Sequence, residues 1–224
     1  ACSVGTYQPS IGQATCINAS PGFYVDSIGQ SSQTACSMGT YNPNIGSTSP
    51  TACLDAPAGH YVDQTGQSNT TACLIGSYNP NTGSTSSTAC IDASIGHYVD
   101  LTGQSSQTAC SAGTYQPSIG QATCISASAG FYVDSIGQSS QTSCSMGTYN
   151  PNTGSTSSAA CSDASVGHYV GQTGQASQTP CPAGYYQPST GQSFCDSASV
   201  GHYVDSSLGK GQSSQTACLA GTYN

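Results

Sequence analysis

The sequence of 224 residues carries very little charge. Lys210 is the one basic residue, glutamate and tryptophan are absent, and the nine acidic residues are all aspartate, so the net charge is -8. A surface that binds nucleic acid needs several lysine or arginine side chains to neutralise phosphates. The composition therefore argues against nucleic acid as a partner.

Long apolar segments are missing as well. Hydrophobic residues make up 35% of the chain and occur singly or in runs of at most four, without the spacing of a helix stripe. No stretch approaches the roughly 20 apolar residues of a membrane span, so we expect no span in this segment. Without a sizeable core, a chain this polar would be disordered unless something else held it in place.

Thirteen cysteines can hold the chain in an ordered structure, because disulfides replace a hydrophobic core in small secreted domains. We therefore expect an oxidised protein that is extracellular or at the cell surface. The cysteines are Cys2, Cys16, Cys36, Cys53, Cys73, Cys90, Cys110, Cys124, Cys144, Cys161, Cys181, Cys195 and Cys218.

One short module is repeated along the whole sequence. It holds a tyrosine with a glycine two residues before it, here called the first glycine, and in eleven copies a glycine five residues after it, the second glycine. A fixed short period is the sequence signature of a repeat architecture. The thirteen tyrosines are Tyr7, Tyr24, Tyr41, Tyr61, Tyr78, Tyr98, Tyr115, Tyr132, Tyr149, Tyr169, Tyr186, Tyr203 and Tyr223.

Two kinds of module alternate. Type A, as in Cys2 to Cys16, has a cysteine before its first glycine and another after its second. Type B has alanine in the first of these places, and glutamine or threonine in the second. The alanines are Ala19, Ala56, Ala93, Ala127, Ala164 and Ala198, and the residues in the second place are Gln33, Thr70, Gln107, Gln141, Gln178 and Gln215.

The joint loss of both cysteines in type B favours disulfides within type A modules. The expected pairs are Cys2–Cys16, Cys36–Cys53, Cys73–Cys90, Cys110–Cys124, Cys144–Cys161 and Cys181–Cys195. A shifted scheme that begins with Cys16–Cys36 and leaves Cys2 unpaired fits the same count, so it stays open. In the first scheme Cys218 is left over, and we expect its partner beyond Asn224 in a longer chain.

Each module is expected to form a β-hairpin or a pair of short extended arms. Proline and asparagine favour the turn, the second glycine supplies positive φ, and the aspartate of type B caps the turn through its own backbone. A hairpin this small is not stable alone, so it must stack on its neighbours. We expect each first glycine to let the next module approach, and the tyrosines to form the nearest thing to a core.

The predicted fold is a small disulfide-rich all-β or irregular repeat. It forms an elongated, solenoid-like rod of stacked short hairpins with no helix of note. The chain is interpreted as one tandem array over residues 1–224, with two blocks of 108 residues at 2–109 and 110–217. Residues 218–224 begin a further, truncated module.

The type A pattern Cys-x-x-Gly-Thr-Tyr-x-Pro-x-x-Gly-x-x-x-Cys, as in residues 110–124, resembles the ephrin-receptor-like cysteine-rich repeat, which is related in style to tumour necrosis factor receptor modules. In that family, modules meet at a Cys-x-x-Cys junction. Here each junction keeps one cysteine, so type B departs from the pattern. The resemblance implies extended extracellular architecture, as in receptor ectodomains and in long arrays of algal and protist surface or mastigoneme proteins, and no single activity.

No catalytic, cofactor or metal site is expected. Four type B modules place a histidine between the first glycine and the tyrosine, at His60, His97, His168 and His202, but Phe23 and Phe131 occupy the same place in the other two. Phenylalanine cannot bind a metal, so a packed ring is the better interpretation than a zinc or pH-sensing site. The turn aspartates Asp26, Asp63, Asp100, Asp134 and Asp205 supply one carboxylate each, short of the six to eight oxygens that calcium takes.

Covalent sugar is expected. Asn18 and Asn69 each begin an Asn-x-Ser/Thr sequon, and Pro21 directly after the first sequon disfavours that site. The 65 serine and threonine residues also invite O-linked sugar, which would supply the solubility that charged side chains usually give.

Repetition without a unique site favours a structural role. The first hypothesis is a glycosylated subunit, or a segment of one, of an extracellular filament, cell-surface hair or fibre that assembles head to tail or laterally with other copies. The second is a ligand-binding stalk of a receptor or adhesin ectodomain, in which only Ser207 to Gln212 breaks the repeat. A third is ice or carbohydrate binding through the serine- and threonine-rich arms. None of the three is an enzyme.

Overall fold

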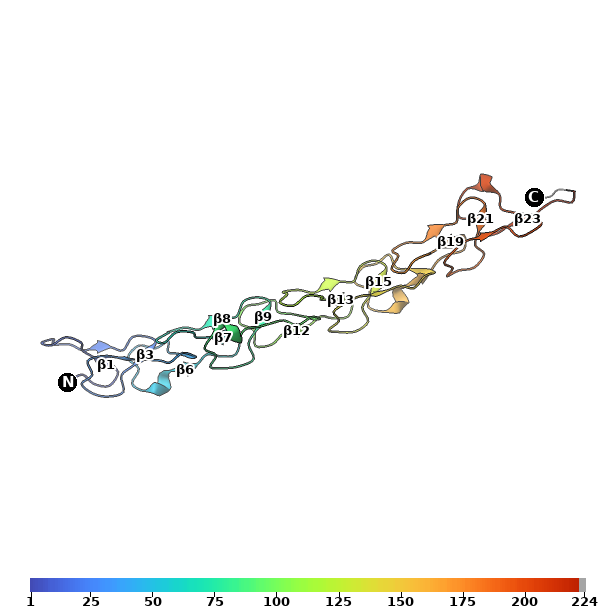
Figure 1. Cartoon of the computed structure of the whole chain (residues 1–224). Helices are drawn as coiled ribbons and strands as arrows, with labels where there is room; N and C mark the ends of the chain where they lie inside the picture. Colours follow the sequence, from blue (N-terminus) through green and yellow to red (C-terminus); the bar gives the residue numbers. More distant parts are fainter. Residues whose placement is uncertain (222–224) are drawn as a thin grey trace. The chain divides into compact units, whose positions relative to one another are not determined.

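The computed structural model describes residues 1–221 of the chain (Figure 1). These residues form two compact units. Unit 1 comprises Ala1–Thr108 and Ser118–Thr123, and unit 2 comprises Ala109–Pro117 and, of the described residues, 124–221. Tyr223, the last of the thirteen repeated tyrosines, lies outside the described residues. The single array over residues 1–224 and its two blocks stay predictions, as does a continuous solenoid-like rod.

Unit 1 is a series of two-stranded antiparallel hairpins, one for each module. The first strand holds the repeated tyrosine, and the second follows the second cysteine of type A or the glutamine or threonine of type B. The pairs are β1 (Thr6–Tyr7) with β2 (Ile17–Asn18), β3 (Phe23–Tyr24) with β4 (Thr34–Ala35), β5 (Thr40–Tyr41) with β6 (Leu54–Asp55), β7 (His60–Tyr61) with β8 (Thr71–Ala72), and β9 (Ser77–Tyr78) with β10 (Ile91–Asp92). Unit 1 also holds β11 (His97–Tyr98), and β12 (Thr108–Ala109) ends where unit 2 begins.

Unit 2 repeats this arrangement. Its pairs are β13 (Thr114–Tyr115) with β14 (Ile125–Ser126), β15 (Phe131–Tyr132) with β16 (Thr142–Ser143), β17 (Thr148–Tyr149) with β18 (Ser162–Asp163), β19 (His168–Tyr169) with β20 (Thr179–Pro180), β21 (Tyr185–Tyr186) with β22 (Asp196–Ser197), and β23 (His202–Tyr203) with β24 (Thr216–Ala217). The predicted disulfide-rich repeat of stacked short hairpins is confirmed.

Within residues 1–221, helical structure is limited to short 3₁₀ turns. Three lie in the longer type A loops: η1 (Pro50–Ala52), η2 (Ser87–Ala89) and η3 (Ser158–Ala160). A fourth, η4 (Ser206–Leu208), lies in the segment that breaks the repeat. There Gly211 donates its N–H to the carbonyl of Cys181, as second glycines do in earlier modules. Gly211 stands eight residues after Tyr203, whereas the other second glycines stand five residues after their tyrosine, so the three extra residues lie in the loop before Gly211.

Backbone hydrogen bonds join each module to the next. In the first pair of modules, Gly5 donates to the carbonyl of Val25 at 2.8 Å and accepts from the N–H of Ala19 at 2.8 Å. Gln8 donates to Gln30 at 3.1 Å, and the second glycine Gly29 donates back to the carbonyl of Cys2 at 2.8 Å. The equivalent four bonds recur at the later junctions within unit 1 up to the one that joins Gly76 to Val99, and in unit 2 from Gly113 to Gln192. Hairpins too small to be stable alone thereby gain partners for their outer backbone groups.

Most of the first glycines lie against the next module but one, whereas Gly184, Gly201 and Gly221 have no such neighbour within 4 Å. A Cβ built on Gly39, whose φ is +83°, would lie 2.5 Å from the carbonyl oxygen of Gly83, two modules further on. Gly5 and Gly113 stand in the same relation to Gly46 and Gly154. The prediction that these glycines allow close approach is therefore correct, but the backbone so approached belongs to the second module along the chain.

The buried interior is made of small side chains. The first cysteine of each of the six disulfide-bonded type A modules and the first alanine of the type B modules up to Ala164 are buried, as is the valine after the tyrosine in those type B modules. The valines are Val25, Val62, Val99, Val133 and Val170. The repeated tyrosines are only partly buried within the described residues, so the predicted tyrosine core is wrong. The close backbone approach leaves room for alanine and valine but not for a phenol ring.

Candidate functional site

The structure forms six disulfides, each within a type A module. They are Cys2–Cys16, Cys36–Cys53, Cys73–Cys90, Cys110–Cys124, Cys144–Cys161 and Cys181–Cys195, the six pairs of the first sequence scheme, and the shifted scheme with Cys16–Cys36 does not occur. Among the described residues Cys218 has a free thiol. A partner for Cys218 beyond Asn224 stays a prediction.

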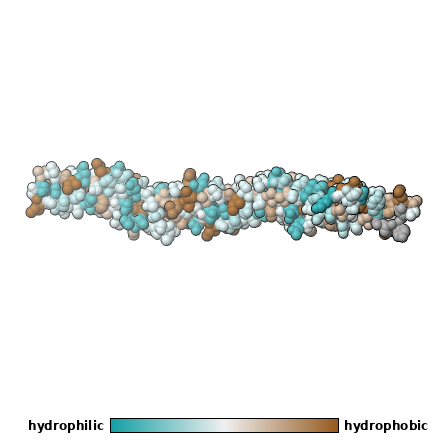
Figure 2. Space-filling view, turned by 90° about the horizontal axis from the view of Figure 1, so that it is seen from above, coloured by the Kyte–Doolittle hydropathy of each residue, from teal (hydrophilic) through white to brown (hydrophobic). Residues whose placement is uncertain are grey.

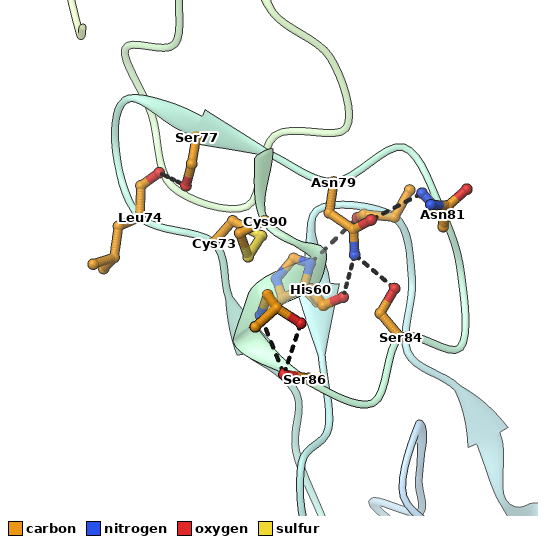
Figure 3. Close-up of a disulfide and its surroundings, with 11 residues drawn as sticks. His60, Cys73, Leu74, Ser77, Asn79, Asn81, Ser84, Ser86 and Cys90 are labelled. Atoms are coloured by element: carbon orange, nitrogen blue, oxygen red, sulfur yellow. Dashed lines mark hydrogen bonds between the residues drawn. A yellow bond between two sulfur atoms is a disulfide. The ribbon is translucent and has the colours of Figure 1, made fainter. Parts of the chain in front are cut away.

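A buried asparagine organises each longer type A module (Figure 3). Asn79 is fully buried, and its Nδ2 donates to the carbonyl of His60 in the preceding module and to the hydroxyl of Ser84. Its Oδ1 accepts from the N–H of Asn81 at 3.0 Å. Both amide hydrogens and the carbonyl oxygen are satisfied, as a buried amide requires. Asn42 and Asn150 repeat the arrangement.

The shorter type A modules use glutamine at the same place. Gln187 is buried, donates from Nε2 to the carbonyl of Phe194, and accepts the N–H of Ser189. Gln8 makes the equivalent bonds within its own module. The longer side chain thus spans the shorter loop. The sequence pattern assigned the asparagines to turns and gave the glutamines no role, although asparagine always accompanies the long loop and glutamine the short one.

Type B modules have a closure of their own, here called the glutamine clasp. The Oε1 atom of Gln33, in the place of the missing second cysteine, accepts the N–H of Ser20 at 2.7 Å. Ser20 follows Ala19, which stands in the place of the missing first cysteine. The same bond joins Gln107 to Ser94, Gln141 to Ser128, Gln178 to Ser165 and Gln215 to Ser199. A hydrogen bond therefore closes the loop where type A has a disulfide.

One type B module lacks the glutamine clasp, and its sequence shows why. In the type B module of Tyr61, proline at position 57 replaces the serine, and proline has no N–H to donate. A glutamine at position 70 would have no backbone donor there, and the residue found is Thr70. This paired change was the signal by which the clasp could have been found from the sequence.

The histidines pack as phenylalanine does. A Cβ on Gly66 would lie 2.8 Å from the ring of Phe23, and one on Gly103 would lie 2.9 Å from the ring of His60. Each of these two rings covers the second glycine two modules further on. In His97 the Nδ1 atom lies 3.1 Å from the carbonyl oxygen of Ile95, so the tautomer protonated at Nδ1 can donate to it. This geometry agrees with the packed-ring interpretation.

The turn aspartates interact mostly with serine. The Oδ1 atom of Asp26 accepts from the hydroxyl of Ser27 at 3.1 Å. Asp205 accepts from both the hydroxyl and the N–H of Ser207, and these bonds lower the pKa of Asp205 below its ordinary value because they favour the charged carboxylate. Backbone capping of the turn, expected for the type B aspartates generally, is thus seen at Asp205. Within residues 1–221, no group of three or more histidine, cysteine, aspartate or glutamate side chains is placed to hold a metal ion.

Both sequon asparagines lie on the surface. Asn18 ends β2, where it pairs with Thr6, and Asn69 lies in the bend before β8. Sugar on either residue stays a prediction. In the part of the chain that the structure describes, no helix has the length and apolar character needed to cross a bilayer.

A comparison with protein families gives a match at two places. The sequence model of the family described as tyrosine-protein kinase ephrin type A/B receptor-like matches residues 1–36 and 96–144. Each of these segments contains a type A module with its disulfide, Cys2–Cys16 or Cys110–Cys124. A search of curated proteins gave no match.

Proposed function

We propose that this chain is a structural subunit, or a segment of one, in an extracellular filament or cell-surface hair. The match of two of its segments to the ephrin-receptor-like family supports this role. Disulfides persist in oxidising compartments, so six of them together with these repeats indicate an extracellular or cell-surface module. The proposed role needs no catalysis and no cofactor. Its partners are other copies of the chain and covalent glycans.

The observation that carries the proposal is the uniformity of the junctions between modules. At the junctions from Gly5 to Gln104 in unit 1 and from Gly113 to Gln192 in unit 2, the same glycine, the same residue after the tyrosine and the same second glycine exchange the same backbone bonds. Backbone bonds of this kind depend little on side-chain identity, so a further module can make the same bonds to the module before it. A binding protein needs at least one module that differs, whereas a structural repeat does not.

Glycosylation belongs to the same proposal. The chain has ten charged residues and 65 hydroxyl-bearing ones, and both sequon asparagines are exposed. Glycan at Asn18 and Asn69 and on the serine- and threonine-rich arms would keep such a surface hydrated. The intact mass of native material should exceed the polypeptide mass of its chain, and a mass equal to the polypeptide would exclude the glycan.

The receptor-stalk alternative has one feature in its favour. The segment Ser207–Gln212 departs from the repeat, contains the end of η4, and exposes Lys210, the single basic side chain. A ligand contact there would be a local property of one module.

Electron microscopy of purified native material tests the proposal. Filaments many times longer than one chain are the expected result. Isolated short particles at every concentration would reject the filament role and leave the receptor stalk as the better interpretation.

A further inference from the structure

The turns of several modules expose an isoleucine directly before the second glycine. The exposed fraction of this side chain is 60–100% in Ile11, Ile28, Ile45, Ile119 and Ile136. The other complete modules with a second glycine in register have threonine there, at Thr65, Thr82, Thr102, Thr153, Thr173 and Thr190. Figure 2 shows the hydrophobic residues as separate spots on a mainly hydrophilic surface in that view. The isoleucines, here called the turn isoleucines, are therefore isolated projections.

The backbone beside most turn isoleucines is fixed. Gly29, next to Ile28, donates its N–H to the carbonyl of Cys2 at 2.8 Å. Gly137, next to Ile136, donates to the carbonyl of Cys110 at 2.7 Å. An apolar group on a backbone that is already ordered loses little conformational freedom when it docks.

Each unit also contains a small pocket at an equivalent place. In unit 1 it lies between Tyr61 and the Cys73–Cys90 disulfide, and in unit 2 between Tyr132 and Cys144–Cys161. The cavity volumes are about 220 and 200 Å³. Equivalent residues complete the two linings: Ala72, Leu74, Ser77 and Ser87 in the first, and Ser143, Ser145, Thr148 and Ser158 in the second. Thr71 also lines the first pocket. The occurrence of the pocket in both units makes it a property of the repeat.

The pocket suits an apolar side chain better than a sugar. No charged residue is among its lining residues, and a tyrosine ring and a disulfide form its walls. Two of its hydroxyls already donate to backbone carbonyls: Ser77 to Leu74 (Figure 3) and Thr148 to Ser145, each at 2.8 Å. These hydroxyl hydrogens are not available to a polar ligand.

We propose that turn isoleucines of one copy of this chain dock into these tyrosine–disulfide pockets of a second copy. The inference rests on the proposed filament function and names its contact surface. The turn isoleucines and the pockets are different surfaces of the molecule, since no turn isoleucine is among the pocket lining residues, so the contact is heterologous. A heterologous contact that does not close into a ring continues indefinitely, which is the geometry of a fibre. With a net charge of -8 on each copy, added salt should strengthen the association, because it screens the repulsion.

The test measures self-association of the purified full chain by sedimentation velocity and light scattering. One variant changes the five turn isoleucines to threonine, a residue that six other modules carry at this place. We expect its dissociation constant to rise on the order of tenfold or more, from the loss of apolar burial. A second variant, Ser87→Leu with Ser158→Leu, fills the pockets at a position where Pro50 stands in another type A module. This variant should weaken self-association by a similar factor. A chain with both sets of changes should associate only slightly more weakly than either variant, because both remove the same contact.

The control changes Ile17, Leu54, Ile91 and Ile125 to threonine, since these strand residues are also exposed but lie outside the turns. We expect no loss, and an equal loss would overturn the docking in favour of general hydrophobic association. Association that survives both variants but disappears on enzymatic deglycosylation would assign the contact to glycan and also overturn the docking. Both outcomes leave the filament role intact. A wild-type chain that stays monomeric at all concentrations would reject the docking and the filament role together.

Discussion

The modules around Cys36 and Ala19 in unit 1 have the same hairpin but close it with different chemistry. Cys36 is joined to Cys53 by a covalent bond, whereas Gln33 in the module of Ala19 accepts one hydrogen bond from Ser20. A disulfide across a loop of this size contributes about 3 kcal/mol in the chain-entropy model. A net hydrogen bond contributes about 1 kcal/mol. Strong, redox-dependent closures therefore alternate with weak, redox-independent ones.

Type B modules do not depend on their neighbours alone. The neighbours do contribute, since four backbone bonds cross each complete junction. Five of the six type B modules add a clasp of their own. The difference between module types is thus one of closure strength, and it can be tested by removing or adding single closures.

The largest effect should follow the loss of one disulfide. Cys73→Ser with Cys90→Ser should cost about 3 kcal/mol of local stability, because the 17-residue separation between the cysteines is no longer constrained in the unfolded chain. Hydrogen exchange followed by mass spectrometry would compare residues 73–90 with the intact residues 36–53 of the same molecule. Cys218→Ser is the matched control and should leave both segments unchanged. Equal protection of residues 73–90 with and without the bridge would contradict the stabilising role of the disulfide.

The next effect concerns the contact between a module and the second module after it. Gly39→Ala places a Cβ 2.5 Å from the carbonyl oxygen of Gly83, whereas Gly12→Ala meets nothing within 4 Å. Both glycines have positive φ and both changes incur that strain. Gly39→Ala should therefore cost about 2 kcal/mol more, the usual size of an overpacking penalty. Urea denaturation of the two variants checks this, and equal costs would show that the backbone moves apart without strain.

The disulfides and hairpins were predictable because the modules of one repeat can be compared with one another. Where both cysteines vanish together, a pairing within the module is the simplest explanation, and the glycine and proline positions indicate the turns. The contact of Gly39 with Gly83 could not be predicted, because it depends on the rotation from one module to the next. Nothing in a single module sets that rotation.

The clasp and the buried amides were missed for a different reason. Gln33 stands in the place of a cysteine, but its partner is a backbone N–H, which almost every residue type has, so the sequence does not identify it. Only Pro57, which lacks the N–H at the equivalent position of another module, indicates which backbone group is the partner. Asn79 was assigned to a turn, and its bond to the carbonyl of His60 in the preceding module again involves a backbone group.

A smaller effect is expected when a clasp is removed. Gln107→Ala deletes the acceptor of the Ser94 N–H and should cost about 1 kcal/mol. Gln107→Glu is the control, because its carboxylate also accepts a hydrogen bond at neutral pH and should preserve the closure. Hydrogen exchange at the Ser94 amide measures both variants. Unchanged exchange in Gln107→Ala would mean that the neighbouring modules alone hold the loop.

The smallest effect, and the sharpest test of the comparison, is the installation of a clasp in the one type B module that lacks it. Thr70→Gln supplies the acceptor and Pro57→Ser supplies the N–H, so only the double variant can form the bond. Pro57→Ser alone should be destabilising by some tenths of a kcal/mol, because it frees the unfolded chain. Thr70→Gln alone should change little, and it keeps the sequon at Asn69. Urea denaturation of the two single variants and the double variant forms a cycle whose coupling energy we expect to be about 1 kcal/mol in favour of folding. A coupling near zero, or full stabilisation by Thr70→Gln without the serine, would show that glutamine stabilises type B loops by some means other than the Ser N–H, and the assignment of the clasp as their closure would have to be withdrawn.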